Sequence, residues 1–158
     1  MKKIALIVTL ISTLLIGNEL KTIDTYNKAL NVAKDTNKTI LFMTSIVGCP
    51  VCDYMKDVVF EKEKVLNYLN KNYVVVVRDA ETQVYPKRFY TRDMPTFYFV
   101  DPTNGKEIRK PKAGGSTTEK FLSLLKMAIE GENNDTFVPK TEEIAIEKKM
   151  KNTMETQI

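Results

Sequence analysis

The sequence predicts an α/β fold in which helices flank a central mixed sheet of four strands, or of five. Two short apolar runs, residues 39–44 and 73–78, have the composition of buried parallel strands, and amphipathic segments lie before and between them. Farther along, residues 92–100 and 106–110 flank the turn sequence Asp101-Pro102-Thr103-Asn104-Gly105, which predicts an antiparallel hairpin. The first half of the chain is thus typical of a βαβ unit, and the second half of a hairpin followed by a helix.

Apolar residues at helical spacing predict the helices in order. The first helix follows Asp24, which can cap its N-terminus, and the second starts at the cysteine pair described below. Residues 61–72 form the third helix, and residues 81–90 form a short one. The last helix begins in the capping box Ser116-Thr117-Thr118-Glu119 and buries an apolar face that includes Ile129.

The 158 residues are predicted to divide into three parts. Residues 1–17 have two lysines before a short apolar run, which is the pattern of a signal peptide, or of a short membrane anchor if the leader is not cleaved. Residues 18–130 have the length of one domain. Residues 131–158 form a highly charged tail, helical or disordered. The net charge of +4 arises from charges of mixed sign and predicts no nucleic-acid partner.

Cysteine occurs at two positions only, in the sequence Gly48-Cys49-Pro50-Val51-Cys52. Thiols separated by the two-residue spacer of Pro50 and Val51 can close and reopen a small disulfide. Zinc is a poor alternative, because the chain has no histidine and a structural zinc ion takes four ligands. A purely structural disulfide is the other alternative, but so short a loop stabilises little. We therefore expect a redox-active disulfide, with no metal and no further cofactor.

The positions of the two thiols predict their roles. Cys49 lies at the start of the predicted helix, where N–H groups favour a thiolate, so it is the expected nucleophile. Cys52 lies one turn farther on and is the expected resolving thiol. Positive charge near Cys49 would favour the thiolate further, and the candidates for it are Lys56, Arg88 and Arg92.

Residues 22–129 resemble the thioredoxin-like superfamily, and in particular its exported branch, which includes periplasmic thioredoxins and the C-terminal domain of the bacterial transmembrane thiol reductase. The resemblance is carried by Gly48-Cys49-Pro50-Val51-Cys52 after an apolar strand and by Met94-Pro95-Thr96 before an aromatic strand. It implies a thioredoxin-like fold, a cis Met94–Pro95 bond facing the cysteines, and a shelf at Met94 and Pro95 on which a substrate backbone pairs. The buried acidic residue of thioredoxins is replaced by Met43.

The resulting functional prediction is a periplasmic thiol–disulfide oxidoreductase that reduces disulfides of exported proteins. A membrane thiol reductase is the expected electron donor, protein disulfides are the expected substrates, and the protein is expected to act as a monomer. A disulfide oxidase or isomerase is the first alternative, because neither motif defines the direction of electron flow. A redox-inert module that binds peptides at Pro95 is the second.

Overall fold

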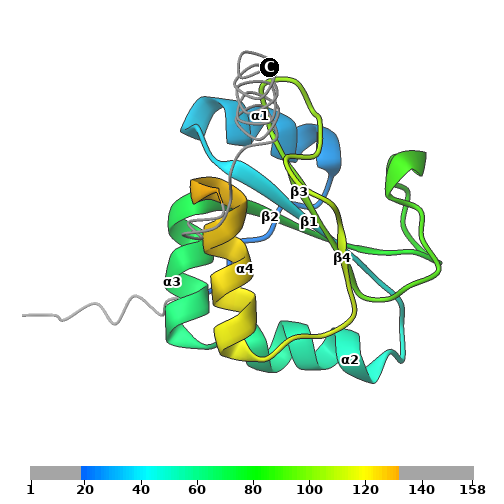
Figure 1. The fold of residues 1–158 in the computed structure, drawn as a ribbon. Helices are drawn as coiled ribbons and strands as arrows, with labels where there is room; N and C mark the ends of the chain where they lie inside the picture. The colour runs from blue at the N-terminus through cyan, green and yellow to red at the C-terminus, as the bar shows by residue number, and fades with distance from the viewer. Residues whose placement is uncertain (1–18, 132–158) are drawn as a thin grey trace, which may run out of the picture.

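The computed structural model describes residues 19–131, in which a four-stranded sheet is flanked by helices (Figure 1). The strands are β1 (Thr39–Ser45), β2 (Tyr73–Asp79), β3 (Thr96–Val100) and β4 (Lys112–Ala113), and their order in the sheet is β2-β1-β3-β4. The predicted leader, residues 1–17, and residues 132–158 of the predicted tail lie outside the described residues.

The sheet is mixed, as the sequence predicts. β1 pairs in parallel with β2 and antiparallel with β3, so that Phe42 stands beside Val76 on one side and Tyr98 on the other. β4 pairs antiparallel with the start of β3. Within residues 19–131 the sheet has four strands, so the prediction of four is confirmed and the alternative of five is wrong for this part of the chain.

The helices cover both faces of the sheet (Figure 1). α1 (Tyr26–Thr36) covers one face, and α3 (Glu63–Asn72) and α4 (Thr118–Glu130) lie side by side on the other. Between β1 and α3 the chain forms a short loop and then α2 (Pro50–Asp53), which continues directly into a π-helix, Tyr54–Val59. A short 3-10 helix, Lys87–Phe89, lies between β2 and β3.

Successive side chains of β1 point to opposite faces of the sheet, so the interior is divided into two cores. Leu41 and Met43 point into the core that contains Cys52, which we call the thiol-side core. Ile40 and Phe42 point to the opposite face of the sheet, into a core rich in aromatic rings, which we call the aromatic core. Because β1 is buried on both faces, its sequence is apolar without a polar alternation.

Two predicted N-caps are displaced by one residue. Thr25, and not Asp24, caps α1, because its hydroxyl accepts the N–H of Lys28 at 3.3 Å. At the start of α4 the cap is Thr117 in place of Ser116, and its hydroxyl accepts the N–H of Lys120. The buried face of α4 also ends earlier than predicted, because Ile129 is 41% exposed.

The predicted helix over residues 81–90 is wrong except for its last turn. The carboxylate of Asp79 accepts the N–H groups of Glu81 and Thr82, and these bonds form a turn where a helix would need the same donors. The predicted return strand over residues 106–110 is also displaced. This segment makes one isolated bridge, between Val100 and Glu107. Regular pairing with β3 resumes only in β4, after Pro111, which has no N–H group to donate to a neighbouring strand.

None of the helices in residues 19–131 combines the length and the apolar character that crossing a bilayer requires.

Phe42 is the centre of the aromatic core and the residue whose loss should cost most there. It is fully buried, and its ring lies against those of Tyr26, Tyr85, Phe89 and Tyr98, at 4.4 Å from the centroid of Phe89. We expect Phe42→Ala to lower the free energy of unfolding by about 3–5 kcal/mol. Urea denaturation of the oxidised protein measures this free energy. Val84→Ala, at an 89% exposed position, is the control and should change it by less than about 0.5 kcal/mol. A loss below about 1 kcal/mol for Phe42→Ala would contradict the expectation.

Candidate redox site

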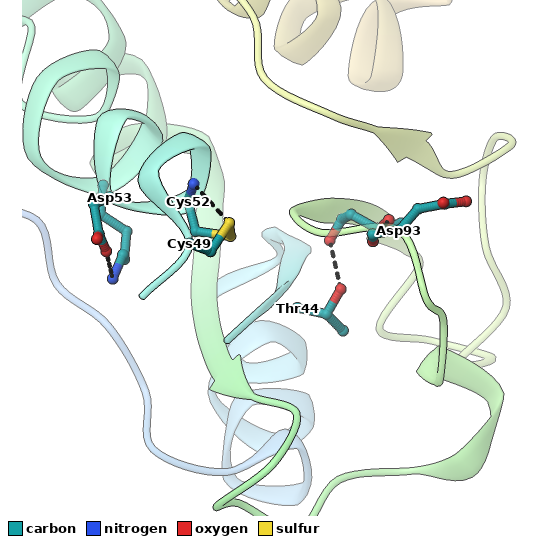
Figure 2. The surroundings of a disulfide bond; sticks show 7 residues. Thr44, Cys49, Cys52, Asp53 and Asp93 are labelled. Atoms are coloured by element: carbon teal, nitrogen blue, oxygen red, sulfur yellow. Dashed lines mark hydrogen bonds and ion pairs between the residues drawn. A yellow bond between two sulfur atoms is a disulfide. The ribbon is translucent and has the colours of Figure 1, made fainter. Parts of the chain in front are cut away.

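Cys49 and Cys52 form a disulfide at the start of α2, with their Cα atoms 5.2 Å apart (Figure 2). Cys49 is the N-cap of the helix, and its sulfur accepts the N–H of Cys52 at 3.2 Å. Pro50 occupies the first helical position, where its missing N–H leaves no hydrogen bond unmade. The predicted sequence of strand, cysteine pair and helix is therefore present.

The two sulfur atoms differ in burial. Cys52 is fully buried in the thiol-side core, whereas Cys49 is only partly buried and packs against the edge of that core. Gly48 has a φ of +72°, a conformation that glycine adopts without strain, and it turns the chain from β1 into the helix. Of the two cysteines, Cys49 is the one that an incoming partner can reach.

Three exposed apolar side chains lie within five residues of Cys49 in the sequence. Val47 is 75% exposed, and Val51 and Tyr54 are each 44% exposed. Of these, only Val51 was among the predicted site residues, as part of the spacer. Tyr54 lies three residues after Val51, which is the spacing of neighbours on one face of a helix, so this signal was available in the sequence.

Met94 and Pro95 lie directly before β3, and the peptide bond between them is cis. Met94 is partly buried and packs against the thiol-side core, to which Cys52 also belongs. Two buried threonines hold this segment: the hydroxyl of Thr96 donates to the carbonyl of Asp93 at 2.6 Å, and the hydroxyl of Thr44 in β1 donates to the carbonyl of Thr96 at 3.4 Å (Figure 2). The end of β1 thus supports Pro95 as well as the cysteines.

The three predicted cations have different surroundings. Lys56 forms an ion pair with Asp53 at 2.8 Å, and Asp53 points away from the sulfur atoms (Figure 2). Arg88 lies on the opposite face of the sheet from Cys52, where its guanidinium donates to the Tyr26 hydroxyl and the Gly105 carbonyl and stacks over the ring of Phe89. Arg88, a candidate source of positive charge near Cys49, thus makes its contacts with residues of the aromatic core. Arg92 is exposed, two residues before Met94.

The position of the buried acidic residue in thioredoxins is apolar here. Met43 is fully buried in the thiol-side core. Within residues 19–131 there is also no group of three or more Cys, His, Asp or Glu side chains placed to hold a metal ion. The chemistry that these residues can carry out is thiol–disulfide exchange.

Asp79 supports the loop that leads to Cys49, a role not predicted from the sequence. Its carboxylate accepts hydrogen bonds from the hydroxyl and N–H of Thr82, each at 2.8 Å, and from the N–H of Val47. These bonds, that to the Thr82 hydroxyl first, hold the pKa of Asp79 below its ordinary value. Asp followed by Thr three residues later is a turn signal that the sequence did contain.

The domain that carries this site matches a known family. A family model described as a thioredoxin-like domain matches residues 26–129. The chain belongs to this thioredoxin-like family. The resemblance carried by the cysteine and proline motifs is thereby confirmed. A search of curated protein sequences gave no match.

Solved structures of thioredoxin-like proteins share the fold. The chain is similar to a thioredoxin from Thermus thermophilus, with 24% identity over 72% of this chain and 90% of that one, at a TM-score of 0.60. It is similar to a DsbH oxidoreductase, with 19% identity over 71% and 85% of the two chains, at a TM-score of 0.57. It is also similar to the oxidised C-terminal domain of DsbD from Neisseria meningitidis, with 14% identity over 65% and 90%, at a TM-score of 0.53.

The thioredoxin-like family and the Cys49–Cys52 pair together make this chain a thiol–disulfide oxidoreductase. The accessible sulfur at a helix start and the buried sulfur one turn farther on are the two groups that the exchange reaction needs.

Replacing Asp79 with Ala is expected to lower the thermal unfolding midpoint at pH 7, because its donors lose their acceptor. The pKa of Asp79 is lowered by folding, so its contribution to stability is fully present above the unfolded value, about 3.9, and is lost as the pH falls through the folded-state pKa. The difference in midpoint from the wild type should therefore be largest at pH 7 and shrink toward pH 2. Asp35→Ala, at an exposed position, is the control and should change the midpoint little at pH 7. A difference for Asp79→Ala that is the same at both pH values would contradict this.

Proposed function

We propose that this chain is an exported thiol reductase, which reduces disulfides of periplasmic proteins and receives its electrons from a membrane thiol reductase. Support for export comes from residues 1–17, where two lysines precede an apolar run. Support for thiol exchange comes from the site, where the partly buried Cys49 sulfur accepts an N–H and the Cys52 sulfur is buried.

In the proposed reaction, the Cys49 thiolate attacks one sulfur of a substrate disulfide and releases the other sulfur as a thiolate. The Cys52 thiol then gives its proton to the thiolate that the substrate has released and attacks the Cys49 sulfur. This step closes the Cys49–Cys52 disulfide, releases the second substrate sulfur and transfers two electrons to the substrate. A dithiol of the membrane reductase restores the reduced pair by the same exchange in reverse. Met94 and Pro95 are the proposed shelf for the substrate backbone, since Met94 packs against the core that holds Cys52.

The charges around Cys49 are the observation that carries the direction of electron flow. A strongly oxidising pair needs a strongly stabilised thiolate. Here the sequence has no histidine, the charge of Lys56 is paired with Asp53, and Arg88 is held on the other face of the sheet. The remaining support for a thiolate comes from the N–H groups at the helix start and from Arg92, whose exposed charge is screened by solvent. A moderately stabilised thiolate makes a reductant rather than a strong oxidant.

The reduction potential of the Cys49–Cys52 pair tests the direction. We expect a value on the order of −190 to −270 mV, between those of glutaredoxins and thioredoxin. Equilibration with glutathione redox buffers, followed by separation of the oxidised and reduced protein, measures it. A potential near about −120 mV would replace the reductase with an oxidase. A pair that does not equilibrate with glutathione would point to a redox-inert binding module.

Single cysteine variants test the roles of the two thiols. Cys52→Ser should accumulate mixed disulfides through Cys49, because the accessible thiolate still attacks and the resolving thiol is missing. Cys49→Ser should accumulate at least about tenfold fewer, because the Cys52 thiol is buried. Mass spectrometry of the adducts after incubation with a protein disulfide gives both amounts. More adducts on Cys52 than on Cys49 would reverse the assignment.

A further inference from the structure

The loop between β4 and α4 contacts both halves of the redox site through three consecutive residues. The N–H of Gly114 donates to the carbonyl of Pro95 at 2.8 Å. The N–H of Ser116 donates to the sulfur of Met55 at 3.3 Å, in the helical segment that carries the cysteines. Gly115 stands between these two anchors. The loop therefore joins the proline segment to the cysteine helix, which are distant from each other in the sequence.

Gly115 lies so close to the cysteine spacer that it has no room for a side chain. A β-carbon on Gly115 would lie 2.7 Å from Cγ1 of Val51, well inside the distance at which two carbon atoms can pack. Backbone conformation is not the reason for glycine here, because positive φ values occur at Gly114 and not at Gly115. The constraint on this residue is the contact with Val51.

Val51 cannot easily move away from an added methyl group. Valine is β-branched and therefore stiff at χ1, and Val51 is the second residue of α2. If Val51 keeps its rotamer, the loop must move, and the hydrogen bond from Gly114 transmits that movement to Pro95. A side chain at position 115 therefore changes the position of Pro95 relative to the two cysteines.

We propose that Gly115 is a positioning residue of the exchange reaction: by seating the loop directly on Val51, it sets the spacing between the Cys49–Cys52 pair and the Met94–Pro95 shelf. This inference rests on the proposed function, in which a protein substrate pairs with that shelf while its sulfur reacts with Cys49. A small disulfide that reacts with Cys49 does not use the shelf. A change at Gly115 should therefore alter the rate of reaction with a protein disulfide and leave the rate with a small disulfide nearly unchanged.

The test compares the full-length wild type with Gly115→Ala on two substrates. Reduction of insulin, a protein disulfide, is followed with dithiothreitol as the electron donor, and oxidation of the reduced protein by glutathione disulfide is followed by stopped flow. We expect Gly115→Ala to lower kcat/KM for insulin by about tenfold, which is the effect of one strained side-chain rotamer, and to change the glutathione rate by less than about twofold. Ser116→Ala, which keeps the backbone N–H that contacts Met55, is the matched control in the same loop and should behave as the wild type.

A second pair of variants tests the contact itself. Val51→Ala removes the methyl group that the new β-carbon would meet. Adding Gly115→Ala to Val51→Ala should therefore lower insulin kcat/KM by less than about threefold relative to Val51→Ala alone, because the two sites are coupled through this contact. The double variant also keeps the inference testable if Gly115→Ala alone does not fold.

Three results would overturn the inference. They are insulin reduction by Gly115→Ala at the wild-type rate, equal losses on insulin and on glutathione disulfide, and a tenfold loss that persists in the Val51→Ala background. A wild-type protein that does not reduce insulin at all would instead contradict the proposed function. The two failures are therefore distinguishable.

Discussion

The central position of β1 is the constraint on which the rest of the site depends. β1 pairs in parallel with β2 and antiparallel with β3, and these two directions bring four chain segments to one end of the sheet. The C-terminal ends of β1, β2 and β4 and the N-terminal start of β3 all lie there. Each of these strand ends contributes one part of the site: the cysteine loop, the Asp79 turn, the Gly114–Ser116 loop and the Met94–Pro95 segment.

The difference in burial between the two sulfur atoms follows from placing the cysteine pair at the start of a helix that packs on the sheet. Cys49 is the N-cap and remains at the surface, whereas Cys52, one turn later, points into the thiol-side core. An accessible sulfur can attack a partner, and a buried one can react only with a sulfur already held beside it. In the proposed reaction, the order of the two exchange steps is a consequence of this helix geometry.

Among the described residues 19–131, few charges are placed to stabilise a thiolate. Thioredoxins place an acidic residue where this chain has Met43, which is fully buried among apolar side chains. Lys56 is paired with Asp53, and the guanidinium of Arg88 lies over the ring of Phe89, a residue of the aromatic core. Arg92 is exposed, so solvent screens its charge, and the backbone N–H groups at the helix start remain, of which that of Cys52 already points at the sulfur of Cys49. The proposed reductase activity depends on this moderate stabilisation.

The sequence by itself determined the elements whose signals are local. The spacing of apolar residues predicted the helices and central strands, and the Gly48–Cys52 motif predicted both reactive residues, because strands, helices and a cysteine pair one turn apart are each defined by neighbours in the chain. Only the tertiary structure decided which distant side chains meet. The guanidinium of Arg88 contacts Tyr26, which is 62 residues earlier in the chain, and this contact depends on the packing of α1 against the sheet. Likewise, Gly115 contacts Val51 and Asp79 contacts the loop of Val47 only because four strand ends converge at one edge, and no local pattern encodes that convergence.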